Sequence, residues 1–329
     1  MERFLVTGAG GQIGTELVRR LGDRHGTDAV LATDVRDPSV WARGGPGAQV
    51  EQLDCLDADA LLRTARDFRT TCIMHLASIL SAAAEASPHR AYRVNMDSLV
   101  NVLEVAAKTG CRVFAPSSIA VFGPESPRDL APQTTVLRPT TMYGVTKVAG
   151  EMLSDYYHGR FGVDVRGLRF PGLVSYTAPP GGGTTDYAVE IFHAAVERRR
   201  YSCPLHPDTR MAMMYMPDAI RAIVELMDAN SSSLRHRNAY NVSAMHFTPA
   251  ELADAIRVRH PEFAIAFEPD PVRQAIADSW PTRIDDARAR EEWGWRHEYE
   301  LPEMVDAMLQ GLEAERTSWA ATLAREAVG

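Results

Sequence analysis

The sequence predicts an α/β fold built on a doubly wound parallel sheet. Short apolar segments alternate with longer amphipathic ones through the first half of the 329 residues, which is the pattern of successive βαβ units. Most neighbouring apolar segments are separated by stretches long enough for a crossover helix, so the strands are expected to run parallel with right-handed connections. A glycine cluster directly after the first segment adds a third indication of this class.

Each element follows from its local pattern. The predicted strands are short and rich in apolar or β-branched residues, and they cover residues 3–7, 29–33, 49–53, 72–76, 112–116 and 163–170. The predicted helices of this half begin near residues 12, 57, 88 and 141, and the last of them ends near residue 161. After Pro171 the pattern predicts a helix over 217–230, a strand over 238–242 and helices over 249–259 and 301–315.

The composition narrows the classes of function. A formal charge of −8 disfavours a nucleic-acid or anionic-membrane surface as a partner. No apolar run approaches the roughly 18 residues of a membrane span, and the first residues lead into a strand pattern rather than a signal peptide. The four cysteines are scattered, and neither H-E-x-x-H nor C-x-x-C occurs, so no metal site is expected. A cytoplasmic enzyme is the expectation.

The glycine cluster lies between the first predicted strand and the first predicted helix. Gly8, Gly11 and Gly14 have the spacing G-x-x-G-x-x-G, with Gln12 and Ile13 between the last two. Glycine permits a tight turn and a close approach of the backbone to a pyrophosphate, and amides at a helix N-terminus favour anions. Because strand, turn, helix and next strand occur in order, the cluster predicts a dinucleotide site.

Two aspartates end the next two predicted strands. Asp34 could accept hydrogen bonds from the adenosine ribose and would repel a 2′-phosphate, which favours NAD over NADP. Arg36 complicates that preference, because a nearby arginine could accommodate the phosphate. Asp54 could reach the adenine amino group, and a simple turn role is the alternative.

Tyr143 and Lys147 lie four residues apart at the start of the predicted helix and therefore share one face. An ammonium near a phenol favours the phenolate, which would lower the pKa of the tyrosine and make it a general base. Among 35 basic residues only Lys108 and Lys147 are lysines, and a compact ammonium is not interchangeable with a guanidinium. Upstream, Ser117 and Ser118 follow a predicted strand, where either could bond a substrate oxygen or cap the backbone.

Together these motifs resemble the extended short-chain dehydrogenase/reductase superfamily, the group of UDP-galactose 4-epimerase. The resemblance covers nearly the whole chain and rests on Gly8, Gly11, Gly14, Asp34, His75-Leu76-Ala77-Ser78, Asn95, Ser118, Tyr143 and Lys147. Three stretches are similar to the short-chain type of L-threonine 3-dehydrogenase in particular, namely residues 116–124, 138–147 and 179–188.

The resemblance implies roles for individual residues. The catalytic residues would be Ser118, Tyr143 and Lys147. The NAD contacts would come from Gly8, Gly11, Gln12, Ile13, Gly14, Asp34, Asp54, Leu76, Ala77, Ser78, Asn95, Tyr143, Lys147 and Phe170. The substrate contacts would come from Ser81, Ser118, Tyr143, Thr184, Thr185 and Asp186, with Asp186 the candidate for an ammonium group.

The implied activity is the NAD-dependent, metal-independent oxidation of the side-chain hydroxyl of L-threonine to 2-amino-3-ketobutyrate. Residues 1–170 would form an NAD-binding Rossmann domain and 171–329 mainly a substrate-binding portion, with about 217–243 returning to the Rossmann sheet. A homodimer through the long helices near 88–108 and 141–161 is expected. A nucleotide-sugar epimerase of the same superfamily is the alternative, and a non-catalytic NAD-sensing protein is a remote one.

Overall fold

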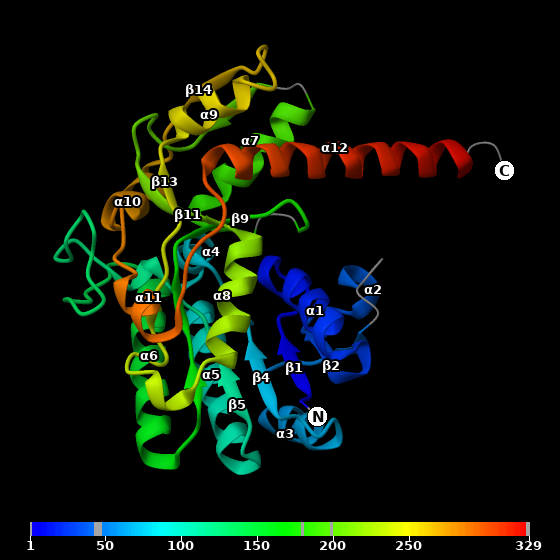
Figure 1. Cartoon of the computed structure of the whole chain (residues 1–329), viewed down its shortest axis with the longest axis vertical. Coiled ribbons are helices and arrows are strands. Elements are labelled where there is room, and N and C mark those ends of the chain that lie inside the picture. The colour runs from blue at the N-terminus through cyan, green and yellow to red at the C-terminus, as the bar shows by residue number, and fades with distance from the viewer. Residues whose placement is uncertain (1, 43–47, 179–180, 198–199, 327–329) are drawn as a thin grey trace.

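Six parallel strands form the central sheet in the computed structural model, in the order β3-β2-β1-β4-β5-β7 (Figure 1). They are β1 (Phe4–Thr7), β2 (Val30–Asp34), β3 (Gln49–Gln52), β4 (Cys72–His75), β5 (Arg112–Phe114) and β7 (Val165–Arg166). The structure describes residues 2–42, 48–178, 181–197 and 200–326. The predicted α/β class with a doubly wound parallel sheet is confirmed, since every neighbouring pair in this sheet is parallel.

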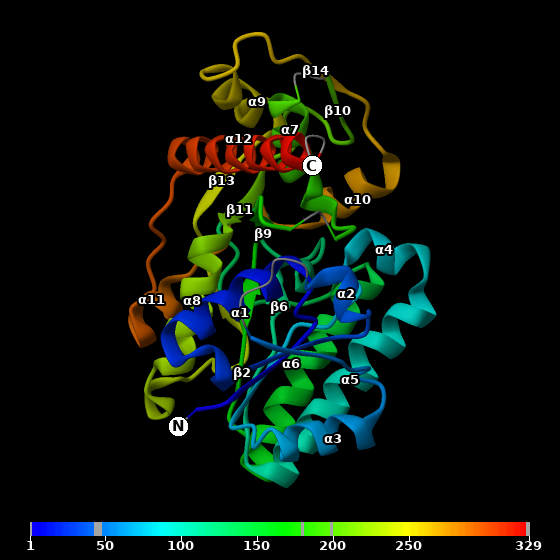
Figure 2. The same ribbon diagram turned by 90° about the vertical axis from the view of Figure 1, so that its right-hand side faces the viewer.

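Helices cover both faces of this sheet. One face carries α1 (Gln12–His25) and α8 (Met216–Asp228), and the other carries α3 (Ala58–Asp67), α5 (Pro88–Thr109) and α6 (Met142–Phe161) (Figures 1 and 2). Alternate side chains of a strand point to opposite faces. Phe4 and Val6 of β1 therefore belong to the core that contains α1 and α8, whereas Leu5 belongs to the core under α3, α5 and α6.

Local signals explain where α6 begins and ends. The Thr141 side chain caps its N-terminus by accepting a hydrogen bond of 3.1 Å from the Gly144 amide. At the other end Gly162 adopts a φ of +70°, the left-handed conformation that terminates helices and that glycine adopts without strain. These bounds place Tyr143 in the first turn, as the sequence predicts.

The segment predicted as a single strand over residues 163–170 is two strands in different sheets, so that prediction is wrong. β7 pairs with β5, whereas β8 (Leu168–Phe170) pairs with β6 (Ser117–Ser118) and β12 (Tyr240–Asn241). Gly167 lies at the break, where a Cβ would come within 2.4 Å of the Ala115 carbonyl oxygen.

The segment that contains β5 and β6 is interrupted beside Gly167. Pro116 separates β5 from β6 and has no N–H to donate to a strand ladder. The central sheet therefore splits at its carboxyl edge, and β6 turns into a small second sheet with the order β12-β8-β6. This split positions Ser117 and Ser118 beside the first turns of α6.

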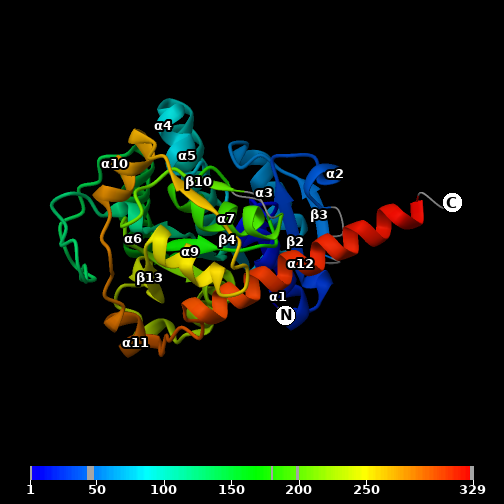
Figure 3. The same cartoon turned by 90° about the horizontal axis from the view of Figure 1, so that it is seen from above.

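The remaining elements form a smaller group above the central sheet (Figure 2). Its strands are β9 (Gly172–Val174), β11 (Met211–Tyr215), β13 (Met245–Phe247), β10 (Tyr201–Cys203) and β14 (Ile265–Phe267). Its helices are α7 (Tyr187–Val196), α9 (Pro249–Arg257), α10 (Pro271–Ser279) and α12 (Leu301–Glu326). α12 packs on α7 and α9 and then extends away from the rest of the molecule (Figures 1 and 3). The short helices α2 (Pro38–Trp41), α4 (Ser81–Ala86) and α11 (Ala287–Trp293) lie outside this group.

The domain division at residue 171 stays a prediction. The structure shows that α8 and Tyr240 of β12 share one core with β1 and α1. Among the described residues, no helix combines the length and the apolar character needed to cross a membrane.

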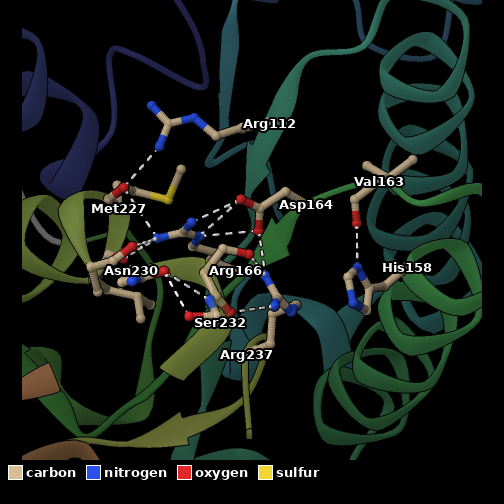
Figure 4. Close-up of polar contacts among 12 residues, drawn as sticks. Arg112, His158, Val163, Asp164, Arg166, Met227, Asn230, Ser232 and Arg237 are labelled. Atoms are coloured by element: carbon tan, nitrogen blue, oxygen red, sulfur yellow. Dashed lines mark hydrogen bonds and ion pairs between the residues drawn. The ribbon is translucent and has the colours of Figure 1, made fainter. Parts of the chain in front are cut away.

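A buried arginine joins β7 to the end of α8. The Nη1 of Arg166 donates to the carbonyls of Leu226 at 2.7 Å and Ala229 at 2.8 Å, and its Nη2 donates to Asp164 at 2.8 Å (Figure 4). Burial opposes ionisation of Asp164, but Arg166 and Arg237 hold the pKa of this carboxyl below its usual value. The last carbonyls of a helix have no partner within the helix, so the guanidinium satisfies that end of α8.

We expect Arg166→Met to lower the free energy of unfolding by about 3 kcal/mol, because it leaves buried carbonyls without a donor and removes one of the two arginines paired with Asp164. The control is Arg138→Met, which removes an ion pair whose Arg138 side chain is 70% exposed and should change stability by less than about 1 kcal/mol. Urea denaturation measures both. Equal losses in the two variants would contradict the role given to Arg166.

Candidate active site

A cavity of about 950 Å³ opens at the carboxyl ends of the central strands. Its walls come from the turn after β1, the ends of β2 and β4, the strand β6, the first turns of α6 and the chain around β9. The strand order reverses between β1 and β4, and this is where open α/β sheets bind ligands. The cavity is therefore the candidate site.

The glycine turn forms one end of the cavity. Gly8 has a φ of +69°, and a Cβ there would lie 2.7 Å from the Ala77 amide nitrogen. A Cβ on Gly14 would lie 2.5 Å from the Gly8 carbonyl oxygen. Gly11 precedes α1 without a capping side chain, so the first-turn amides of Gln12 and Ile13 remain available to an anion.

A polar atom without a partner marks the same place. Among the described residues, the Nε2 of Gln12 is one of few buried side-chain nitrogens or oxygens that make no hydrogen bond. Leaving such a donor unsatisfied is costly, and Gln12 lines the cavity at the N-terminus of α1. The residues present therefore fit the pyrophosphate of a dinucleotide.

Asp34 lies at the end of β2, in the wall of the cavity. Its carboxylate accepts the Gly10 amide at 3.1 Å and forms a two-point ion pair with Arg36, at 2.9 Å from Nε and 3.0 Å from Nη2. Burial raises the pKa of Asp34, but the hydrogen bonds and charge of Arg36 outweigh it and leave the pKa lowered. Arg36 is thus held by Asp34, and the charged carboxylate in the cavity wall would repel a 2′-phosphate.

The other predicted dinucleotide residues divide into two groups. Asp54, Leu76, Ala77, Ser78 and Phe170 line the cavity. Asn95 lies behind its wall, where the side chain accepts the Ile79 amide at 2.8 Å and donates to the Ile79 carbonyl at 3.1 Å. Asn95 therefore fixes the loop after β4, which lines the cavity.

The three predicted catalytic side chains come together at the centre of the cavity. Ser118, Tyr143 and Lys147 all line the cavity, the Ser118 hydroxyl acts to lower the pKa of the Tyr143 phenol, and the Lys147 ammonium lies 5.4 Å from the centre of the Tyr143 ring. The Nζ of Lys147 donates to the Pro116 carbonyl at 2.8 Å. Ser117 is separated from the phenol, because its hydroxyl donates instead to Glu151 at 2.5 Å.

Burial sets the pKa values of the tyrosine and the lysine. It raises the pKa of Tyr143 to about 12, against the lowering hydrogen bond from Ser118, and lowers the pKa of Lys147 to about 8. The expectation that Lys147 gives this tyrosine a lowered pKa is therefore wrong for the protein alone, because the cost of desolvating a phenolate is larger. A positive charge brought into the cavity would favour the phenolate.

The opposite end of the cavity carries the predicted substrate residues. Ser81, Thr185 and Asp186 line it, whereas Thr184 is fully buried and its hydroxyl lies 3.1 Å from that of Ser81. The Oδ2 of Asp186 accepts the amides of Gly182 and Gly183, each at 2.8 Å. Residues 179 and 180 of the stretch 179–188 lie outside the described residues.

Sequence reasoning missed several residues of the cavity wall. Trp280, which follows α10, lines the substrate end and is only 5% exposed. Leu80 and Gly181 face the same space, and Arg93 of α5 reaches the wall from the other side. No local motif marks Trp280, whereas the neighbours of Ser81 could have been found from their position after β4.

The fold and the site define a dinucleotide-dependent enzyme of the open α/β class. Residues 4–243 match the NAD dependent epimerase/dehydratase family, and the chain belongs to that family. Its cofactor is NAD, which the glycine turn and Asp34 fit. The resemblance to extended short-chain dehydrogenases is thereby confirmed.

Solved structures refine this assignment. The chain is similar to L-threonine dehydrogenase from Clostridium difficile, with 48% identity, 96% of this chain and 98% of that chain covered, and a TM-score of 0.91. It is similar to the holo form of a GalE-like L-threonine dehydrogenase from Cupriavidus necator, with 49% identity, 94% and 99% coverage and a TM-score of 0.90. A curated relative from Staphylococcus haemolyticus, an uncharacterised epimerase/dehydratase, is 49% identical over 95% of this chain and 98% of its own length.

We expect Asp34→Ser to weaken NADH binding by about 1–3 kcal/mol, because the ribose loses a charged acceptor. The same change frees Arg36 for a phosphate, so NADPH binding should strengthen. Fluorescence titration with the two reduced dinucleotides measures both, and Asp37→Ser, in an exposed carboxyl that caps α2, is the matched control. Unchanged preference in Asp34→Ser would show that this carboxylate does not select the cofactor.

Proposed function

We propose that this protein oxidises the side-chain hydroxyl of L-threonine to 2-amino-3-ketobutyrate, with NAD as the electron acceptor. The observation that carries the proposal is that Ser118, Tyr143 and Lys147 line one cavity together with the glycine turn and Ser81. The likeness to proteins described as L-threonine dehydrogenases, at 48–49% identity over almost the whole chain, supports the choice of substrate.

The residues of this chain divide the chemistry among them. Tyr143 removes the proton of the substrate hydroxyl, and Ser118 holds the same oxygen by a hydrogen bond. Bound NAD supplies the hydride acceptor and a positive charge. Lys147 keeps its ammonium beside the phenol and, through the Pro116 carbonyl, stays fixed to the strand that carries Ser118. Burial of the phenol excludes water from the proton transfer.

The substrate end fits a small zwitterion. Ser81 and Thr185 offer hydroxyls for a carboxylate, whereas the glycine-loop amides of Gly182 and Gly183 are already bonded to Asp186. Asp186 is the proposed partner of the ammonium group. The Oδ2 of Asp186 accepts two amides of that loop. The oxygen proposed to bind the substrate ammonium is therefore Oδ1. Burial raises the pKa of Asp186, against those two hydrogen bonds, so a cation beside it would favour its charged form.

We expect wild-type protein to release NADH when it is given L-threonine and NAD, and Tyr143→Phe to lower kcat by about 10²–10⁴-fold, because the base is lost. The KM for NAD should stay within about twofold, since the ring remains. Absorbance of NADH measures the reaction. Tyr157→Phe is the matched control, because it removes a buried phenol hydroxyl of the same helix that bonds Glu104 far from the cavity.

Two outcomes would contradict the proposal. Full activity in Tyr143→Phe would remove the tyrosine from its role. Interconversion of a sugar nucleotide without release of NADH would favour the epimerase alternative, because an epimerase regenerates its bound cofactor in each cycle.

We also propose that the protein forms a homodimer through the outer faces of α5 and α6. Val145, Met152 and Tyr156 lie along one stripe of α6 that faces away from Tyr143, and they are 45%, 67% and 57% exposed. Exposed apolar side chains that form a stripe are typical of an interface. One solved relative, 44% identical, is described as monomeric.

We expect light scattering to give wild-type protein twice the 36.2 kDa mass of one chain. Met152→Glu should shift it to the monomer, because a buried carboxylate without a partner opposes association. Val258→Glu changes an exposed valine after α9 and serves as the control. A wild-type mass of one chain would contradict the dimer.

A further inference from the structure

Three residues of helix α6 face the three successive residues of the segment 116–118. Tyr143, Lys147 and Glu151 are spaced four apart on one face of α6. They face three successive residues: the Pro116 carbonyl accepts from Lys147, Ser117 donates to Glu151, and the Ser118 hydroxyl acts to lower the pKa of Tyr143. Two of these contacts involve predicted catalytic groups. The third, between Ser117 and Glu151, has no place in the proposed chemistry.

The Glu151 carboxylate is tied to a second strand as well. Arg169 of β8 donates to it from Nε at 2.8 Å and from Nη2 at 2.7 Å. Both side chains are buried, with 6% and 9% exposed for Arg169 and Glu151. Arg169 is the residue opposite Ser117 in the β6–β8 register. A single carboxylate therefore holds β6 and β8 against the helix that carries the base.

A buried ion pair adds little net stability, but displacing one partner leaves an uncompensated buried charge, which is costly. Here the neighbouring contacts reinforce it: the Nη1 of Arg169 donates to the Gln133 carbonyl at 2.9 Å, and Asn238 donates to the Glu151 carbonyl at 2.7 Å. Every group around the carboxylate thus comes from a different part of the chain. Moving Glu151 would move β6 relative to α6.

We propose that Glu151 is a positioning residue for the reaction, which through Ser117 sets the distance between the Ser118 hydroxyl and the Tyr143 phenol and keeps a negative charge one helical turn from Lys147. The inference rests on the proposed function. Glu151 touches neither substrate nor NAD in this role; it acts through Ser117 and Lys147.

The charge of Glu151 has a direct consequence for Lys147. It raises the pKa of the ammonium against the lowering effect of burial. The other titratable groups near Lys147 are Tyr143 on α6 and His75 on β4, whose own pKa burial lowers to about 3, so the imidazole stays neutral. Removing the negative charge should therefore lower the pKa of Lys147 further.

The first experiment separates positioning from catalysis. Ser117→Ala removes the tether and leaves the pair of Glu151 and Arg169 intact. We expect kcat to fall about tenfold, because small displacements of reacting groups are costly, while the KM values for L-threonine and NAD stay within about twofold. Glu104→Gln is the matched control, since Glu104 also accepts a hydroxyl from an α6 neighbour, Tyr157, outside the cavity.

Three results of this experiment bear on the proposal. A kcat for Ser117→Ala equal to that of Glu104→Gln would overturn it. A loss as large as that of Tyr143→Phe would also overturn it, because Ser117 would then be a catalytic serine. A lower melting temperature with unchanged kcat would show a structural role only.

The second experiment needs no turnover and uses the scarcity of lysine. With lysine labelled at ¹³Cε, the protein gives signals from Lys108 and Lys147 alone, and Lys108→Arg assigns them. In Glu151→Gln we expect Lys147 to titrate roughly half to one pH unit lower than in wild type. Near-ultraviolet circular dichroism confirms that the variant is folded. In Glu104→Gln, whose carboxylate pairs with Lys108 in wild type, the Lys147 signal should titrate as in wild type.

An unchanged titration of Lys147 in folded Glu151→Gln would overturn the electrostatic part of the proposal. If Glu151→Gln does not fold, the kinetics of Ser117→Ala decide whether Glu151 is a positioning residue. If wild-type protein releases no NADH from L-threonine, the proposed function fails, and the titration of Lys147 still decides whether Glu151 acts on it.

Discussion

The register between α6 and the segment 116–118 is the constraint on which the site depends. A helix and a strand rarely match over several residues, because their repeats differ. Here the match covers only three residues, and it is possible because β6 has left the central sheet. The absence of an N–H at Pro116 and of a side chain at Gly167 creates that departure. Pro116 and Gly167 thus determine where the Ser118 hydroxyl lies relative to the Tyr143 phenol.

Burial of Tyr143 and Lys147 in the cavity wall disfavours the charged form of both side chains. It favours the neutral form of Tyr143 and the neutral form of Lys147, so the protein alone does not store a phenolate–ammonium pair. Charge separation becomes favourable when the cavity holds a cationic ring. The phenolate is therefore scarcely populated in the absence of the cofactor and would become more populated when it binds, which couples proton removal to the presence of a hydride acceptor.

The sequence predicts well those features that depend on local physics. The glycine turn, the strand ends at Asp34 and the bounds of α6 follow from conformational freedom, burial and capping. The split of residues 163–170 was not predicted, because the contacts that force it at Gly167 come from the distant Ala115 and Asn238. Trp280 and Glu151 were missed for the same reason, since long-range packing alone gives them their neighbours.

The strands of the second sheet become available at different times as the chain is synthesised. β6 carries Ser118, but it is completed by β8 and, beyond it, by β12 at Tyr240–Asn241. Arg169 reaches the Asn241 side chain at 3.3 Å. As the chain leaves the ribosome, the glycine turn, the helix with Tyr143 and β8 all emerge well before β12. The sheet that carries Ser118 is thus complete only after residue 241 has emerged, whereas the glycine turn and its strand lie at the start of the chain.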